Sequence, residues 1–459
     1  MNPTRILNTI LLWVMALYML LNHGFMQLRI PPVGGAGIPI GEMVLFLSLI
    51  SINYAKLLPK LFSLVFIYPF LVWWGLGIGR AFIGFLEYGM WALRDATHVL
   101  ESLFLLVGFA FAADPKMIDR FFRWLPKILA ATVVYSALFP FIDVLQSFSP
   151  TIISANGVVT PIFFNYVGSP NYAIMAAAYV FIFQKEIRVN IIRNQPIATA
   201  AVLWGGCAAL FQSRTIYLQI IATMILFGFY RRKLLSQSVL VIVLLLGIVA
   251  LLPVIGLQIK GRLGEVSINF LINHFLAIGG VMSETAGDNV KGAAEGVMQR
   301  TDWWMSIYHR LTSDIWNLLF GLGYGIPLTD FRYYGGVIVR EPHNSYISIL
   351  ARIGLLGGIA WVWLQGQMLR IWHSGYQMCD RIGWRQGQNQ LLILMVHFVL
   401  IWVYSIGEDA MEKPFFTIPY YFFWGIALRY VLHLRNGKIG PNVDGKQENY
   451  LYTNCKTLS

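Results

Sequence analysis

The sequence predicts an all-α membrane protein that crosses the bilayer many times, and its composition and apolar pattern both point to this fold class. Of its 459 residues, 57% are hydrophobic and only 12% are charged, which is about half the charged fraction of ordinary soluble domains. The hydrophobic residues form repeated apolar stretches, and about 20 such residues are enough to cross the hydrocarbon core. Each stretch must be helical, because lipid offers no hydrogen-bond partner to an open backbone. A soluble globular enzyme is therefore excluded.

Charged and polar residues divide the apolar stretches into about twelve predicted spans. The first is not followed by a small-residue cleavage site, so we interpret it as a retained span rather than a signal peptide. The spans lie near residues 6–22, 40–55, 61–79, 98–113, 125–145, 170–184, 196–212, 215–230, 235–256, 345–371, 390–407 and 414–433. An even number of spans places both termini on the same side of the membrane.

The formal charge of +12 is distributed unevenly between the loops. With the N-terminus inside, the inner loops hold most of the lysines and arginines. The short outer loops hold only Arg29, Arg80, Arg94, Arg214 and Lys413. Basic residues collect on the cytoplasmic side of membranes, so both termini are expected in the cytoplasm and nucleic acid is not expected as a partner. The three cysteines fit neither a metal site nor a disulfide framework.

The spans and loops predict four segments. They are an N-terminal transmembrane bundle of about nine spans at 1–256, a large outer loop at 257–344, C-terminal transmembrane helices at 345–434 and a cytoplasmic tail at 435–459. A loop of this length commonly carries function. Within it, Trp304, Ile307 and Leu311 recur at helical spacing, which predicts an amphipathic helix against the membrane surface. The glycines of FGLGYG then predict a turn.

Three groups of polar residues lie on the predicted outer face. Arg214, in the sequence SRT, could simply extend to the lipid headgroups, but its planar fork of donors also suits a lipid-linked phosphate. Arg300 and Arg310 belong to the amphipathic helix, where a basic face usually rests on anionic lipid. His343 and Asn344 come just before the tenth span. A lone histidine is more often structural, yet one at the water boundary can exchange protons.

Four motifs in this order lie between about residues 160 and 430: GSPNYAIMAAAYVFIF, SRT, QRTDWWMSIY with LLFGLGYG, and PHNSYISILARIGLLGG. They are similar to the Gly-x-Pro-Asn entry to a span, the Ser-Arg motif, the arginine, tryptophan and glycine-turn segment, and the HN-x-x-L motif of one superfamily. That superfamily is the bacterial O-antigen ligases and polysaccharide polymerases, in which the histidine follows a large periplasmic loop. The order, spacing and sidedness of the motifs agree with this resemblance.

One position departs from the family pattern. Many relatives carry an acidic residue on the helix after the HN motif, whereas this chain has Arg352 near that position. The role of Arg352 is therefore open. So is the question of which acid, if any, takes the place of the missing one: the candidates are Glu341, Glu408, Asp409 and Glu412.

The resemblance implies the GT-C-like fold of O-antigen ligases and an inverting glycosyltransferase on the periplasmic face of a bacterial inner membrane. The donor would be a glycan on undecaprenyl diphosphate or a similar polyprenyl diphosphate. The acceptor would be a hydroxyl of another glycan or of lipid A core, in lipopolysaccharide or exopolysaccharide biosynthesis, with other assembly proteins as possible partners. Arg214 and Arg300 would clamp the diphosphate, and His343 would accept the acceptor's proton. Further substrate-binding residues would be Asn344, Ser213, Arg310 and Asn171.

No cofactor is expected, and the outer loops contain no Asp-x-Asp motif or His/Cys cluster that would supply metal ligands. We therefore predict that the activity needs no metal.

Several alternatives stay open at the level of sequence. Polymerase, ligase and protein O-glycosylation differ only in the acceptor, and neither the sugar nor the oligomeric state can be read from the residues. A flippase or transporter of lipid-linked oligosaccharide is the alternative of another class, favoured by His98 and Glu101 in the fourth span. Against it, the polar residues gather on one face and the large loop is one-sided, whereas transporters have repeated halves with polar groups near the midplane.

Overall fold

The computed structural model describes residues 3–30, 37–153, 159–259, 261–279, 288–329, 331 and 339–441. It is mostly helical, at 76%, and the predicted all-α class is confirmed at that level. The sheet in this part of the chain consists of two short antiparallel hairpins. Strand β1 (Arg29–Ile30) pairs with β2 (Ile38–Pro39), and β3 (Thr151–Ile153) pairs with β4 (Val159–Pro161).

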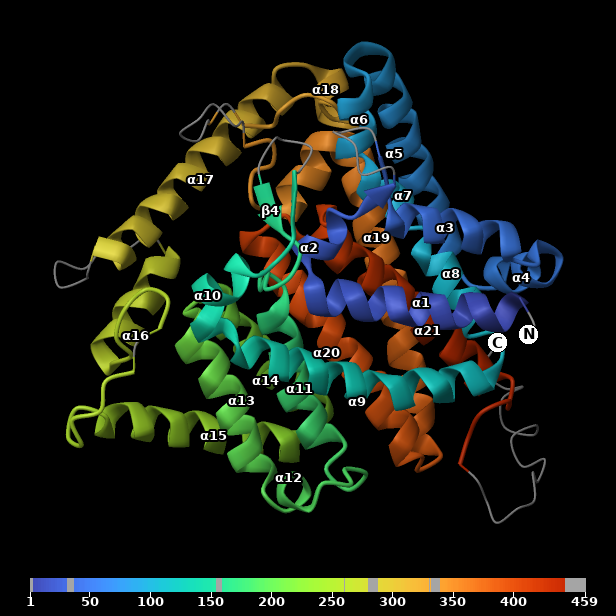
Figure 1. The fold of residues 1–459 in the computed structure, drawn as a ribbon. Helices are drawn as coiled ribbons and strands as arrows, with labels where there is room; N and C mark the ends of the chain where they lie inside the picture. The colour runs from blue at the N-terminus through green and yellow to red at the C-terminus, as the bar shows by residue number, and fades with distance from the viewer. Residues whose placement is uncertain are drawn as a thin grey trace.

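A helix lies in each of the predicted apolar stretches (Figure 1). These helices are α1 (Pro3–Leu21), α3 (Ile40–Ser51), α5 (Ile67–Tyr88), α8 (Phe104–Phe111), α9 (Pro115–Ala137), α11 (Ser169–Ile182), α13 (Pro196–Phe211), α14 (Arg214–Tyr230), α15 (Arg232–Leu251), α19 (Ser345–Arg381), α20 (Arg385–Gly407) and α21 (Pro414–Arg435). Shorter helices connect them: α2 (His23–Met26), α4 (Tyr54–Phe62), α6 (Met90–Asp95), α7 (Thr97–Glu101), α10 (Ile142–Ser147), α12 (Asn190–Asn194), α16 (Ile268–Leu276) and α18 (Ile315–Phe320). Three 3-10 turns, η1 (Phe139–Phe141), η2 (Ala277–Gly279) and η3 (Ala410–Glu412), complete the connections.

The count of twelve spans is not confirmed. Five described helices, α5, α15, α19, α20 and α21, are long and apolar enough to cross a membrane. The number rises to seven if two bent pairs each count as one span: α3 with α4, bent by 96°, and α7–α8 with α9, bent by 115°. Other apolar helices, such as α13 and α14, are shorter than the roughly 20 residues that a bilayer needs.

Helix α21 forms the centre of the bundle, and nearly all of it is buried. It packs most extensively against α8. Their backbones approach so closely that a methyl group added at Gly425 would lie 2.2 Å from the Leu105 carbonyl oxygen, and one at Gly108 would lie 2.1 Å from that of Phe422. Small residues at helix crossings allow such contact, which is how membrane helices gain packing energy without a hydrophobic driving force.

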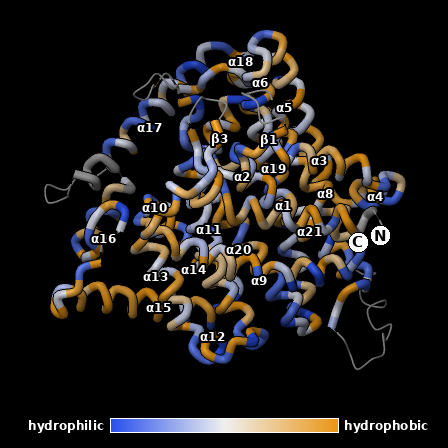
Figure 2. Tube along the Cα trace, in the orientation of Figure 1, coloured by the Kyte–Doolittle hydropathy of each residue, from blue (hydrophilic) through white to orange (hydrophobic). Residues whose placement is uncertain are grey.

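A helix, α17 (Asp288–Thr312), forms where the sequence predicts an amphipathic helix in the large loop, and its position against the membrane surface stays a prediction. Ile307 and Leu311 are buried and pack against Leu328 and Ala351, at the start of α19. Figure 2 shows polar and apolar residues alternating along α17, whereas α15 is hydrophobic almost throughout. The predicted turn after it is also present, since Gly321, Gly323 and Gly325 all have positive φ.

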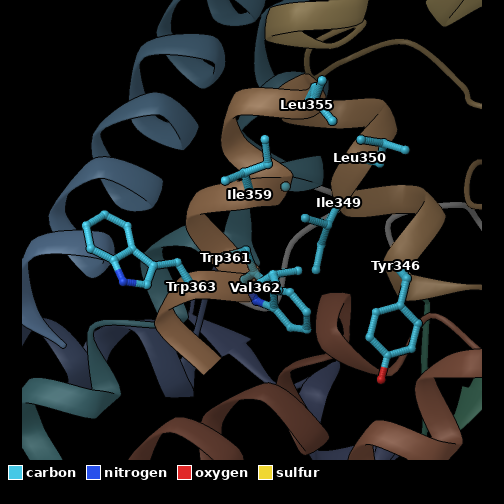
Figure 3. Close-up of a pocket in the computed structure, with 9 residues that line it drawn as sticks. Tyr346, Ile349, Leu350, Leu355, Ile359, Trp361, Val362 and Trp363 are labelled. Atoms are coloured by element: carbon cyan, nitrogen blue, oxygen red, sulfur yellow. The ribbon is translucent and has the colours of Figure 1, made fainter. Parts of the chain in front are cut away.

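Helix α19 is not the continuous span that the sequence predicts from residue 345. Gly354 has φ 67° and ψ −169°, outside the helical region. In a straight helix, Tyr346 and Trp361 would lie roughly 22 Å apart along the axis, yet their ring centroids are 5.8 Å apart. The chain therefore folds back at Gly354 into a short arm, residues 345–353, and a long arm, residues 355–381 (Figure 3).

The glycine turn after α18 explains why α19 breaks at this point. The N–H groups of Leu322 and Gly323 donate to the carbonyl oxygens of Ala351 and Arg352, at 2.6 and 3.1 Å. They satisfy carbonyls at the end of the short arm that would otherwise lack partners. A side chain at Gly354 would meet backbone atoms of Gly321 and Leu319 at 2.4 Å. Only glycine accepts both this contact and this conformation.

We predict that Gly354→Ala destabilises the protein by about 1–3 kcal/mol, because its φ and ψ lie in a region that only glycine populates readily. Gly366→Ala is the matched control, since Gly366 lies on the long arm with no atom within 4 Å of an added methyl group. It should be neutral or stabilising by up to about 1 kcal/mol. Thermal unfolding of the purified variants in detergent measures both effects. Equal stability of Gly354→Ala and wild type would mean that α19 runs straight.

Candidate active site

Polar residues from four distant parts of the chain meet at one place. They come from the start of α14, from α17, from the segment before α19, and from the connection between α20 and α21. In the sequence these parts are separated by apolar spans. The fold brings together three of the predicted site residues, Arg214, Arg300 and His343, and adds acidic residues whose roles the sequence leaves open.

The carboxylate of Glu408 lies at the centre of the site. Glu408 directly follows α20, and its Oε1 accepts a hydrogen bond from Nη2 of Arg300 at 3.5 Å. Its Oε2 accepts one from Nδ1 of His343 at 3.1 Å. Arg300 also donates from Nη1 to the Gly407 carbonyl oxygen at 2.8 Å. The arginine of the large loop and the histidine of the HN motif thus share one carboxylate.

A second carboxylate completes the charge cluster. Nδ1 of His343 lies 3.4 Å from Oδ1 of Asp409, and the same oxygen lies 2.9 Å from Nζ of Lys413. Burial disfavours the charged imidazole, but hydrogen bonds to Asp409 and Glu408 outweigh it and raise the pKa of His343 to about 9. Burial likewise opposes ionisation of Glu408, yet His343 and Lys413 lower its pKa overall. His343 is therefore an imidazolium at neutral pH in the absence of substrate.

The backbone at His343 is unusual, because its φ of 51° lies in the left-handed region. For a residue other than glycine this conformation costs about 1–2 kcal/mol and is often found where a side chain must be aimed. Two tryptophans of α17 support the segment. The Trp303 ring lies 6.0 Å from the imidazole, and Nε1 of Trp304 donates to the Pro342 carbonyl oxygen at 3.0 Å. Since Nδ1 faces the carboxylates, Nε2 is the nitrogen that can meet a substrate.

Arg214 begins α14 and borders the same site. Its Nη1 donates to the Ala277 carbonyl oxygen at 2.6 Å, and its charge interacts with those of Arg300 and Glu408. A methyl group at Gly407 would lie 3.7 Å from Oγ1 of Thr215 and 4.0 Å from Nη1 of Arg300, so the SRT turn and Arg300 flank the same glycine. The site then holds four cations, Arg214, Arg300, His343 and Lys413, against two carboxylates. The surplus favours an anionic ligand.

The other predicted binding residues have mainly structural contacts. Asn344 caps α19, with Oδ1 accepting from the N–H groups of Tyr346 and Ile347, while its Nδ2 donates to the Ile406 carbonyl oxygen. Ser213 occupies the N-cap position of α14 without a side-chain cap bond.

Arg310 and Asn171 lie in structural positions as well. Arg310 donates to the carbonyl oxygens of Pro327 and Leu328 and so holds the chain beyond the glycine turn. Asn171 is buried in α11, where it accepts a hydrogen bond from Gln219. Their roles as substrate ligands stay predictions.

Arg352, the departure from the family pattern, has an acidic partner. It is buried at the end of the short arm, and its Nη2 lies 2.6 Å from Oε1 of Glu341 and 3.2 Å from Oδ2 of Asp95. Its Nη1 donates to the carbonyl oxygens of Gly323 and Ile326. Asp95 also binds Arg340, at 2.6 Å. Arg352 therefore ties the glycine turn to α19, beside the segment that carries His343.

Glu412 lies beneath the site. Its Oε2 accepts a hydrogen bond from Oγ of Ser345 at 2.7 Å, and burial, together with the charges of Glu341 and Asp409, raises its pKa to about 8.

The sequence leaves Glu408 and Asp409 as open candidates and gives Lys413 no role at the site. They lie in GEDAMEK, a short polar connection between two apolar stretches on the predicted outer face. This density of charged residues between two spans is the feature of the sequence that indicates a functional role for the connection. Nothing in the sequence tells which of its acids faces a histidine 65 positions earlier.

His343, Glu408 and Asp409 also present ligand atoms within 4.8 Å of one another, as a metal site would. Two observations argue that the donors do not fit an ion. Asp409 already contacts Lys413 at 2.9 Å, and Glu408 contacts Arg300. A divalent cation would have to displace these cations and remove the proton from His343, because a metal binds the neutral imidazole.

Comparison with known proteins finds a family match for part of the chain. Residues 199–362 match the family model of O-antigen ligase. This segment belongs to the O-antigen ligase superfamily. The match runs from α13 to the upper long arm of α19 and includes Arg214, Arg300 and His343, but it ends before Glu408. No curated protein matches the chain.

The match to the O-antigen ligase family suggests a role in polysaccharide or glycan ligation and an activity of the glycosyltransferase type. The apolar helices and the family together indicate a membrane location.

Proposed function

We propose that the protein transfers a glycan from a polyprenyl diphosphate to a hydroxyl acceptor on the periplasmic side of a bacterial inner membrane, in O-antigen or exopolysaccharide polymerisation or ligation. The observation that carries this proposal is the meeting of Arg300 and His343 over Glu408, with Arg214 beside them. This arrangement supports a site with a cation for the leaving group and a proton acceptor. The surplus of positive charge suits a diphosphate.

The arginines act on the donor. Direct attack of the acceptor oxygen on the anomeric carbon forms the new glycosidic bond and breaks the bond to the diphosphate, which leaves with the electron pair. Negative charge grows on the diphosphate during this step, so hydrogen bonds from Arg214 and Arg300 strengthen in the transition state. Attack from the face opposite the leaving group inverts the anomeric centre.

His343 acts on the acceptor. In its neutral form, Nε2 accepts the proton of the attacking hydroxyl while Nδ1–H stays bound to Glu408, as in a Ser-His-Asp arrangement. A pKa of about 9 makes the imidazole a strong base, although roughly one molecule in a hundred holds it neutral at pH 7. Glu408 then stabilises the imidazolium that forms. Asn344 fixes the histidine by capping α19 and binding the end of α20.

The site residues can be tested by substitution in cells that lack the native protein. We expect His343→Ala, Arg214→Ala and Arg300→Ala each to lower glycan transfer by about 100-fold or more, because each removes charge stabilisation or proton transfer. Arg232→Ala, at an exposed position at the start of α15, is the matched control and should keep full activity. Glycan length on gels, with protein levels checked, is the readout.

The residual glycan identifies the acceptor. Single repeat units in the inactive variants mean a polymerase, and unattached long chains mean a ligase. Unchanged product in all three alanine variants would contradict the assigned site and favour transport of the lipid-linked oligosaccharide.

The same activity should not depend on a metal. With Lys413 and Arg300 already neutralising the carboxylates, we expect full transfer by the purified protein in excess chelator. Loss of activity that a divalent ion restores would overturn this expectation and assign the ion to His343, Glu408 and Asp409.

A further inference from the structure

An apolar groove lies between the two arms of α19 (Figure 3). The short arm contributes Tyr346, Ile349 and Leu350, and the long arm contributes Leu355, Gly358 and Ile359. The two arms face each other because the chain reverses at Gly354. At the inner end, the Tyr346 ring meets that of Trp361 with a centroid distance of 5.8 Å, and the tyrosine hydroxyl donates to the Trp402 carbonyl oxygen on α20.

The outer wall of the groove, formed by Ile359 and Val362 of the long arm, lies on the protein surface. Ile359 is 56% and Val362 is 63% exposed, and both lie in a helix apolar enough to span a membrane. Apolar side chains exposed on a spanning helix face lipid. The groove thus opens toward hydrocarbon on one side.

The inner end of the groove adjoins the candidate active site. Tyr346 lies three residues after His343, and its N–H group donates to the side chain of Asn344. The Tyr346 end of the groove therefore lies about one helical turn from the segment that carries His343. The groove leads from the lipid-facing surface toward the place proposed for the diphosphate.

The two arms of α19 lie close together, and this limits what can bind between them. A methyl group added at Gly358 would lie 3.4 Å from Cδ1 of Leu350, so the arms almost touch at its floor. Packing a helix requires about 8–10 Å between axes, so neither a second copy of the chain nor a partner helix fits between the arms. The groove has a volume of about 490 Å³, which leaves room for a single hydrocarbon chain.

We propose that this groove binds the isoprenoid chain of the glycan donor next to its diphosphate. The inference rests on the proposed function, because only a lipid with an anionic headgroup uses both the groove and the cations at its inner end. An acyl chain of a phospholipid could lie in the groove, but its headgroup would not place a diphosphate at the inner end.

The test compares two donors that carry the same glycan, a long one on undecaprenyl diphosphate and a short one on methyl diphosphate, which has no chain to enter the groove. Gly358→Leu fills the groove floor and should lower the ratio of kcat/KM for the long donor to that for the short donor by about tenfold. Gly366→Leu makes the same substitution on the same helix, where an added side chain meets open space. Its ratio should equal that of wild type.

A second variant, Val362→Trp, narrows the groove from its exposed wall and serves if Gly358→Leu does not fold. It should also lower the ratio of kcat/KM for the long donor to that for the short donor. An unchanged ratio in a folded, active groove variant would overturn the proposal and leave the groove to bulk lipid. Inactivity of wild type with both donors would instead contradict the proposed function, so the two failures can be told apart.

Discussion

The carboxylate of Glu408 is the interaction on which the rest of the site depends. It binds Arg300 through one oxygen and His343 through the other, at 3.5 and 3.1 Å, and so holds together segments that approach from the large loop and from the start of α19. Groups of like charge at such short range would repel one another without it. Asp409 and Lys413 extend the cluster, and the balance leaves positive charge for an anionic ligand. Removing one partner from a desolvated cluster is costly, because the remaining charges lose their compensation.

The position of His343 depends in turn on the reversal of α19. The glycine turn after α18 supplies donors to the carbonyls of Ala351 and Arg352, and Arg352 binds Glu341 and Asp95 on its buried side. These contacts fix the orientation of the short arm, so that His343, just before it, faces the end of α20. The same reversal creates the apolar groove beside Tyr346. The conformation of Gly354 therefore determines both the position of His343 and the shape of the apolar groove.

Much of this arrangement can be predicted from sequence, but not all of it. The apolar stretches locate the helices, since their composition leaves no other structure open to them in lipid. They do not reveal which helices bend or fall short of a full span, and so the count of twelve was not confirmed. The break at Gly354 is hidden because RIGLLGG offers three glycines within an apolar run, and only the contact with Gly321 selects one. Motif order predicts Arg214, Arg300 and His343 as site residues, whereas the pairing of Glu408 with His343 depends on a tertiary contact that no local pattern encodes.

The pH dependence of kcat/KM, measured with the purified protein and a polyprenyl-diphosphate-linked glycan, tests most directly whether His343 and Glu408 act as a proton-accepting pair. Only the neutral imidazole accepts a proton, so activity should rise with pH and level off near the His343 pKa of about 9. In Glu408→Gln the rising limb should move to lower pH, because a hydrogen bond that stabilises the imidazolium is lost. Activity that falls as pH approaches 9, or an identical profile in the two proteins, would contradict this account.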